Sequence, residues 1–479
     1  MIRIRVDAGS ALQPVDRRKL GLNINYLMDG DVPPPGARSV TEALRELGVG
    51  ALRYPGGEKS DTFLWSVPPY DRPVPTPAGD LRDRYGKSGD KMVHPDGYTY
   101  RKRPLDFDAF IKMCRDTGAE PVVVVAYDCL HMEPTPRSKW PSRERLLESA
   151  VAWIKYANIT KKYRVRYWEI GNEGYIDKTV KARDYAADVV LFSRAMKAVD
   201  PEIRIGANGP TGADDTGNAA QAAGDTTSWW KTVIETAGPD IDFLAVHSYP
   251  CWKWKTYAHY AENDPPLCPE CAGALEALRR WATPADRNRI RLLITEANAA
   301  DWSSTQGTKD GWPMVGDLGH AVVLFDMLGS ALLNPALDAF MVWNTRWINN
   351  GERPELWDTI DPNNEITAIG RPIAIWGKHA LDLMVTAEGS GPVRAYATKS
   401  ADGKKLTVFL INRGMVPAEA GVEIAGFTSA GPATRWVFHG SGPDDLKPAW
   451  ERSGEVALEG GPARSDLPGV SVTVLVFGS

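Results

Sequence analysis

The feature of this 479-residue sequence that most constrains its fold is a regular alternation of short apolar runs with longer amphipathic segments. The short runs lie at 20–25, 51–54, 121–127, 165–170, 203–207, 243–247, 290–295 and 339–343. Helical spacing of apolar residues occurs at 40–47, 105–117, 143–158, 182–199, 272–281, 320–333 and 373–384. Alternating strands and helices predict a parallel sheet, and eight strands predict closure into a (β/α)8 TIM barrel of the α/β class.

An open, doubly wound sheet is the structural alternative to this barrel. It would usually carry a glycine-rich phosphate loop after an early strand, and no such loop follows any early run here. Three long polar connections, at 56–103, 250–269 and 297–317, each follow an apolar run. In a barrel they would lie at the carboxyl end of the strands, where loops shape a binding cleft.

The pattern changes after about residue 385, where helical periodicity stops. Segments of alternating polarity occur at 393–398, 405–412, 421–424, 434–438 and 470–477, separated by Gly and Pro. They predict a C-terminal antiparallel β-sandwich, and the similar strand Ile2–Val6 is expected to pair with it. We therefore expect an N-terminal strand at 1–12, a catalytic barrel at 13–384 and a structural sandwich at 385–479.

Charge and hydropathy exclude two classes of partner. The net charge is −5 and no long Lys/Arg block is present, which argues against nucleic-acid binding. No apolar run approaches the length of a membrane span. The N-terminus lacks the apolar core of a signal peptide, so we expect a cytoplasmic protein, or a secreted one from which a signal has been removed.

The five cysteines are too few for a disulfide framework in a chain of this length. Cys268-Pro-Glu-Cys271 has the spacing of metal ligands, and Cys251 and His259 lie upstream. A structural zinc site and an incidental or disulfide-forming loop both remain open. For the reaction itself we expect no metal and no other cofactor, because the seven His residues are scattered singly.

Two glutamates stand at the ends of apolar runs, Glu173 after the fourth and Glu296 after the seventh. Either one alone could be a cap or a salt bridge at the rim. Strands four and seven of a closed barrel face each other, however, so the two carboxyl groups can converge on one substrate atom. Glycoside hydrolysis needs such a pair, and a separation of roughly 5–5.5 Å makes one carboxylate a nucleophile, with retention of configuration.

Further side chains at the same strand ends are candidates for binding substrate or orienting the carboxylates: Arg53, Asn172, His247, Tyr249 and Trp343. Arg53 would hold one carboxylate ionised, and His247 or Tyr249 would orient Glu296. Each also has a purely structural interpretation, such as an ion pair inside the barrel. The chain contains 17 Trp residues, and indole rings stack well on sugars.

The motifs Leu52–Gly57 (LRYPGG) and Trp168–Glu173 (WEIGNE) resemble those of clan A glycoside hydrolases. They are most similar to family 51, the α-L-arabinofuranosidases, and families 39, 44 and 79 share parts of the pattern. The resemblance implies double displacement on plant-type polysaccharides or oligosaccharides, with Glu173 as acid/base and Glu296 as nucleophile. It also implies that Asn172 contacts the substituent next to the anomeric carbon. Assembly into a homo-oligomer is a further implication.

The sequence departs from family 51 at two positions. Asn25 stands where that family usually carries a sugar-binding Glu, and Thr295-Glu296-Ala297-Asn298 replaces Asp-Glu-Trp. Trp252 lies in a Trp-rich loop that would suit pyranose stacking. An endo-acting β-1,4-glucanase or xylanase of the same clan, and a non-catalytic carbohydrate-binding barrel, are therefore kept as alternatives; a metal-dependent hydrolase would need His/Asp clusters that are missing.

Overall fold

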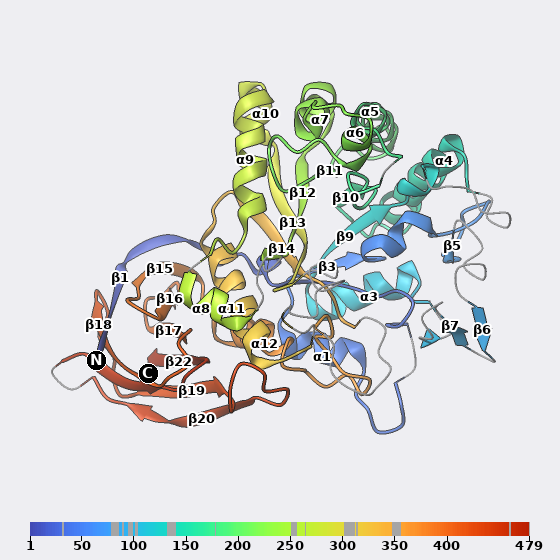
Figure 1. Cartoon of the computed structure of the whole chain (residues 1–479). Helices are drawn as coiled ribbons and strands as arrows, with labels where there is room; N and C mark the ends of the chain where they lie inside the picture. The colour runs from blue at the N-terminus through green and yellow to red at the C-terminus, as the bar shows by residue number, and fades with distance from the viewer. Residues whose placement is uncertain are drawn as a thin grey trace.

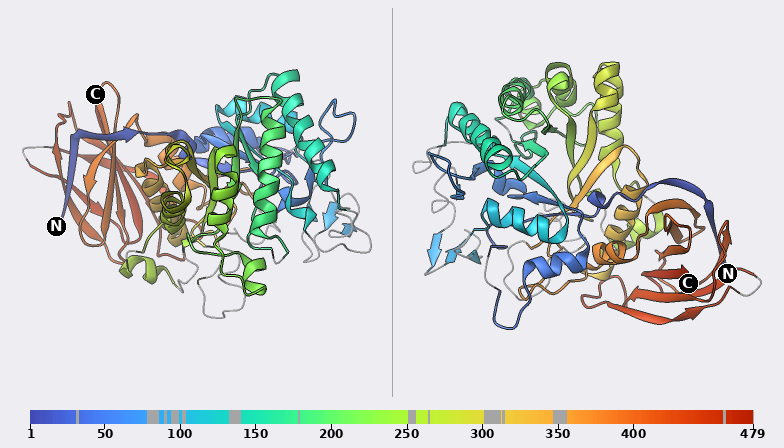
Figure 2. Two further views of the ribbon diagram at one scale, coloured as in Figure 1. Left: turned by 90° about the horizontal axis from the view of Figure 1, so that it is seen from above. Right: turned by 180° about the vertical axis from the view of Figure 1, so that it is seen from behind.

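The chain folds into a barrel and a β-sheet domain that lie side by side in the computed structural model (Figure 1). The structure describes residues 1–30, 33–77, 86–88, 91–93, 99–100, 104–131, 140–177, 179–250, 256–263, 265–300, 312, 315–346, 356–458 and 461–478. Both termini lie in the sheet domain (Figure 2).

The barrel is closed by parallel strands only, in the order β10-β11-β12-β13-β14-β2-β3-β9. Its strands are β2 (Gly21–Asn23), β3 (Ala51–Tyr54), β9 (Glu120–Val125), β10 (Tyr167–Ile170), β11 (Arg204–Asn208), β12 (Phe243–Ser248), β13 (Arg291–Ala297) and β14 (Leu337–Val342). Each overlaps one of the eight apolar runs. The predicted (β/α)8 barrel is thus confirmed.

One helix follows each barrel strand: α1 (Val40–Leu47), α3 (Phe107–Thr117), α4 (Arg143–Ile154), α5 (Ala182–Lys197), α7 (Trp229–Ala237), α9 (Pro269–Trp281), α11 (Leu318–Leu333) and α12 (Arg371–His379). Shorter helices in the connections are α6 (Asn218–Ala222), α8 (Tyr257–Asn263) and α10 (Pro284–Arg289). Local sequence sets the ends of these helices. Ser39 and Glu42 form a reciprocal capping box at the start of α1, and Gly48 ends it in the left-handed conformation.

One predicted helix was too long, and one helix was not predicted. The helix expected at 373–384 ends at His379, because the chain turns into strand β15 at Leu383. Helix α7 was missed, since its nine residues follow a long polar stretch that hides the start of the apolar pattern. The segment predicted as a helix at 143–158 changes to π-helical geometry at Lys155–Thr160.

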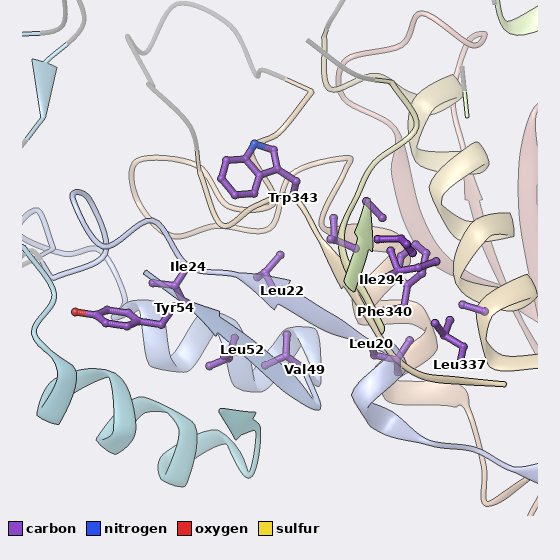
Figure 3. Close-up of a cluster of buried hydrophobic side chains, with 14 of the residues drawn as sticks. Leu20, Leu22, Ile24, Val49, Leu52, Tyr54, Ile294, Leu337, Phe340 and Trp343 are labelled. Atoms are coloured by element: carbon purple, nitrogen blue, oxygen red, sulfur yellow. The ribbon is translucent and has the colours of Figure 1, made fainter. Parts of the chain in front are cut away.

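Apolar side chains fill the barrel on both sides of its wall. The interior holds a small cluster that includes Tyr167, Phe243 and Met341. Leu22 and Leu52 belong to the large core between the strands and the surrounding helices (Figure 3). Polar and charged side chains therefore concentrate at the carboxyl ends of the strands, where the functional site lies.

The second domain is one nine-stranded sheet in the order β20-β19-β22-β17-β16-β15-β1-β18-β21. Its strands are β1 (Ile2–Pro14), β15 (Leu383–Glu388), β16 (Val393–Lys399), β17 (Lys405–Asn412), β18 (Ala418–Ala425), β19 (Ala433–His439), β20 (Ala449–Val456), β21 (Ala463–Leu467) and β22 (Ser471–Gly478). Side chains from all nine strands form one apolar cluster, as expected of a sandwich interior.

The N-terminal strand joins this sheet, as the sequence predicted, but its pairing is mixed. β1 is antiparallel to β15 and parallel to β18, so the sandwich is not wholly antiparallel. β1 also continues to Pro14, beyond the expected boundary at residue 12. The expected domain boundaries remain predictions.

A buried polar junction connects the two domains. Asp326 of α11 accepts hydrogen bonds from Tyr396 of β16 (2.6 Å) and Tyr260 of α8 (2.7 Å). It also pairs with Arg394 at 2.8 Å. Trp376 of α12 packs on Phe409 of β17, with ring centroids 4.1 Å apart. These contacts make the sheet domain a lateral support for the barrel.

Candidate active site

A tight turn after β10 carries Glu173. Gly171 has a φ of +70°, and a Cβ atom there would lie 2.8 Å from Asp128 Oδ2. The same Asp128 oxygen accepts the backbone N–H of Asn172 at 2.6 Å. Burial raises the pKa of Asp128 to about 7, and the hydrogen bond from Asn172 opposes this shift. The turn leaves the Glu173 side chain 29% exposed at the mouth of the barrel.

Glu296 lies near the end of β13, and its side chain is only 7% exposed. In the register of the neighbouring strand it pairs with His247 of β12. One carboxylate oxygen of Glu173, one of Glu296 and a ring nitrogen of His247 all lie within 4.8 Å of one another. The two carboxyl groups predicted from strands four and seven therefore converge at one point.

Arg53, at the end of β3, contacts both β13, which carries Glu296, and the turn after β10, which carries Glu173. Its guanidinium group donates to Glu296 Oε1 at 2.8 Å and to Asn172 Oδ1 at 2.9 Å. It also donates to Glu169 Oε2 at 2.9 Å and to Asn23 Oδ1 at 3.0 Å. The Arg53 side chain is fully buried, so the two carboxylates compensate its charge in a low-dielectric environment.

His247 and Tyr249 contact different members of the pair. His247 Nδ1 lies 2.7 Å from Glu173 Oε1 and 3.5 Å from Glu296 Oε2. Tyr249 donates to Glu296 Oε2 at 3.0 Å. Burial lowers the pKa of His247, but the charges of Glu296 and Glu173 outweigh it, so the pKa is raised above 6.5. Tyr249 is thus the closer hydrogen-bonding partner of Glu296, and His247 that of Glu173.

Sequence reasoning missed three supporting residues. Glu169 points into the barrel from the middle of β10 and shares Arg53 with Glu296. Asn23, at the end of β2, accepts a hydrogen bond from Arg53, and Asp128 accepts one from Asn172 in the turn before Glu173. The only signal was a polar residue within an apolar run, or directly after one in the case of Asp128, and the partner of such a residue depends on closure of the barrel.

Trp343 follows the end of β14 and lies above the apolar wall formed by β2 and β3 (Figure 3). Its ring packs so closely on Gly57 that a Cβ atom there would lie 2.1 Å from it. Lys59 Nζ lies 4.9 Å from the centroid of the Trp343 ring, and burial lowers the pKa of Lys59 to about 8. Trp343 therefore has a fixed orientation at the rim of the barrel.

Two candidates from the sequence remain, Asn25 and Trp252. Asn25 is fully buried. Its amide donates to the carbonyl of Arg346 at 2.9 Å, and its side-chain oxygen accepts the N–H of Leu27 at 3.2 Å. These contacts hold the loop after β2. Trp252 lies outside the described residues.

A pocket of about 930 Å³ opens beside Glu173. Its walls come from the connections after β10, β11 and β12 and from the start of α9, and they include His247 and Tyr249. This volume is at the upper end of the range typical of ligand pockets, roughly 300–1,000 Å³.

The described residues give no support to the zinc interpretation. Among them, the group of His, Cys, Asp and Glu side chains close enough to hold a metal ion is Glu173, His247 and Glu296. Cys268 and Cys271 are free thiols at the start of α9. Cys251 lies outside the part of the chain that the structure describes. In the same part, no helix is both long and apolar enough to cross a membrane.

Part of the chain, including residues of this site, is similar in sequence to known proteins. The family described as "Alpha-L-arabinofuranosidase 1 domain" matches residues 43–249, which include the segments bearing Arg53 and Glu173. Alpha-L-arabinofuranosidase C of Emericella nidulans is 27% identical over 306 residues, covering 57% of this chain and 52% of that protein. The chain thus spans about half the length of the curated relatives it matches.

Solved structures extend the likeness in fold to the whole chain. The α-L-arabinofuranosidase of Thermotoga maritima in its arabinose complex has a TM-score of 0.74 at 17% identity, with all of both chains covered. CelM2, a bifunctional glucanase-xylanase from a metagenome library, has a TM-score of 0.66 at 16% identity, with 100% of this chain and 99% of that chain covered. Sequence and fold together confirm the resemblance of this chain to the family 51 α-L-arabinofuranosidases of glycoside hydrolase clan A.

Proposed function

We propose that this protein is a retaining glycoside hydrolase that removes α-L-arabinofuranosyl residues from plant-type polysaccharides or oligosaccharides. The observation that carries the proposal is the convergence of Glu173 and Glu296, since one carboxylate oxygen of each lies within 4.8 Å of the other. Retaining enzymes need a separation of roughly 5–5.5 Å, whereas inverting enzymes leave roughly 6.5–9.5 Å for a water molecule. The non-catalytic alternative offers no reason for two carboxylates to be supported by buried cations and hydroxyl groups.

In the first step, the Glu296 carboxylate attacks the anomeric carbon and forms a glycosyl ester. Arg53 and Tyr249 each donate a hydrogen bond to one of its oxygens, which orients the carboxylate toward the substrate. Glu173 simultaneously gives its proton to the departing oxygen. Its greater exposure suits a group that must exchange protons with solvent.

In the second step, Glu173 acts as a base and removes a proton from water. That water attacks the anomeric carbon and releases Glu296, with overall retention of configuration. His247 lies between the two carboxylates and moderates the charge change at Glu173. Arg53 holds Asn172 Oδ1, which turns the amide NH2 group of Asn172 toward the sugar hydroxyl next to the anomeric carbon.

An endo-acting β-1,4-glucanase or xylanase is the second candidate function. The environment of Asn25 favours it, because this buried amide binds the backbone of Arg346 and Leu27 and supplies no carboxylate to a furanose. A wide pocket beside the acid group is also consistent with binding within a chain. In both functions Glu173 and Glu296 keep their roles.

The test of the proposal is hydrolysis of 4-nitrophenyl glycosides by the wild-type protein, Glu173→Ala and Glu296→Ala. The arabinofuranoside should be cleaved best among the arabinofuranoside, xyloside, glucoside, galactoside and glucuronide, and NMR should show the retained anomer as first product. Best activity on soluble xylan or β-glucan would favour the endo-acting candidate. Inversion at the anomeric centre would contradict both.

Several other features are part of the same proposal. We assign catalysis to the barrel at 13–384 and a structural role to 1–12 and 385–479. Assembly into a homo-oligomer remains a prediction that sedimentation velocity would test, and the cellular compartment remains a prediction as well.

A further inference from the structure

The pocket beside Glu173 lies to one side of the catalytic pair. Glu173 is part of its wall, whereas Glu296 is not among the residues that line it. An acid/base group stands on the side of the departing oxygen, because it protonates that oxygen. If the proposed function is correct, the pocket therefore lies where the leaving group of the substrate is held.

The pocket combines apolar surfaces with a few polar groups. Several prolines, Tyr175 and Ile176 provide flat or apolar walls that suit the faces of a sugar ring. The described carboxyl groups in its lining are Glu173, Asp215 and Glu270. Such a lining favours an uncharged ligand and disfavours one that carries a carboxylate.

Glu270 is a buried carboxyl group in the pocket wall that has no role in the proposed reaction steps. It lies in the first turn of α9 and is only 5% exposed, yet it lines the pocket. Ser248, at the end of β12, donates to Glu270 Oε2 at 2.6 Å. Burial raises the pKa of Glu270 to about 7, against the hydrogen bond from Ser248, so near neutrality the carboxyl group can both donate and accept.

We propose that this pocket is a subsite for an uncharged pyranose residue of the leaving group, and that Glu270 binds a hydroxyl group of that residue. The inference rests on the proposed function for its direction and goes beyond it by assigning a specificity-determining residue. The hydrogen bond from Ser248 orients this buried carboxyl group, which is part of the pocket wall. Such a residue distinguishes a sugar that carries the hydroxyl group from one that lacks it, because the buried carboxyl group would be left unpaired by the second.

The experiment compares Glu270→Ala with the wild type on two substrates. One is 4-nitrophenyl α-L-arabinofuranoside, whose leaving group has no sugar hydroxyl, and the other is a xylo-oligosaccharide substituted with arabinofuranose. We expect kcat/KM to fall about tenfold on the oligosaccharide and to change little on the aryl glycoside. Glu270→Gln, which keeps hydrogen-bonding atoms, should recover part of the loss. Glu276→Gln, on the exposed side of α9, is the matched control.

A second measurement does not depend on turnover. Calorimetry with xylotetraose should show binding to Glu173→Ala and about tenfold weaker binding to Glu173→Ala/Glu270→Ala, with no binding of a tetramer of galacturonic acid. Equal losses on both substrates, or unchanged xylotetraose binding, would overturn the role of Glu270. Binding that depends on Glu270 in a protein that hydrolyses no glycoside would instead overturn the proposed function and leave the sugar subsite standing.

Discussion

Arg53 Nη1 lies 2.8 Å from Glu296 Oε1 and 3.0 Å from Asn23 Oδ1, so one buried nitrogen connects the proposed nucleophile on β13 to strand β2. The remaining nitrogens of the same group reach Glu169 and Asn172. A shorter cation could not satisfy all four acceptors.

We therefore predict that Arg53→Lys strongly impairs activity although it conserves charge. An ammonium group cannot reach Glu169 and Glu296 together, and breaking a buried ion pair costs about 3–5 kcal/mol. Loss of about 3 kcal/mol of this support in the transition state corresponds to a fall in kcat/KM of about 100-fold. Steady-state kinetics on an aryl arabinofuranoside would measure it, with exposed Arg279→Lys as control. Activity within threefold of the wild type would contradict the role given to Arg53.

The second prediction concerns the dependence of stability on pH at His247. Its folded-state pKa is raised above 6.5, since the charges of Glu296 and Glu173 outweigh the opposing effect of burial. The imidazolium therefore contributes stability that is fully present below pH 6.5 and is lost as pH rises through the folded pKa. Urea unfolding of the wild type and His247→Gln should differ most near pH 6 and progressively less above it. A difference that grows with pH would show that the sign is wrong.

The third prediction concerns the pH dependence of stability at a buried acid, Glu270, which has the same sign as that at His247. Burial raises the pKa of Glu270 from 4.5 to about 7, so the folded state holds its proton longer than the unfolded state. This difference in pKa stabilises the folded state below pH 4.5. The contribution, about 3 kcal/mol in total, is lost as pH rises through about 7. In denaturant titrations, the free energy of unfolding of Glu270→Gln should change less between pH 4.5 and pH 7 than that of the wild type. Parallel curves would exclude a raised pKa.

The fourth prediction tests the junction between the domains. Asp326→Ala leaves Arg394 without its buried partner and removes the acceptor of Tyr260 and Tyr396. Unfolding free energy should fall by about 3–5 kcal/mol, visible as a lower melting temperature in calorimetry. Exposed Asp402→Ala should have almost no effect. Replacing Asp326 and Arg394 together by apolar residues should restore much of the loss, because no charge is then left unpaired.

The barrel could be predicted from the sequence because each of its strands is a continuous apolar run followed by helical spacing. Glu173 and Glu296 were identifiable because a carboxylate directly after such a run is unusual. Helix α7 was not, since its apolar face spans only nine residues. The parallel pairing of β1 with β18 was also hidden, because strand direction is decided by contacts far apart in the chain.

The finer structure of the site depends on closure of the barrel. Sequence left open whether His247 or Tyr249 orients Glu296; geometry places the Tyr249 hydroxyl on Glu296 and the His247 ring closest to Glu173. Glu270 gave no signal beyond its place in the Cys268–Cys271 motif. Its partner Ser248 is 22 residues away, and only the packing of α9 on β12 brings the two together.

The central claim is that Glu296 attacks the anomeric carbon while Glu173 serves as acid and base. Its most direct test is mass spectrometry of the protein after reaction with an activated 2-deoxy-2-fluoro-arabinofuranoside, whose fluorine slows hydrolysis of the glycosyl ester. We predict one added fluoro-sugar per chain, located by peptide mapping on Glu296 and absent from Glu296→Ala. A label on Glu173, or an active enzyme that acquires no label, would contradict the account.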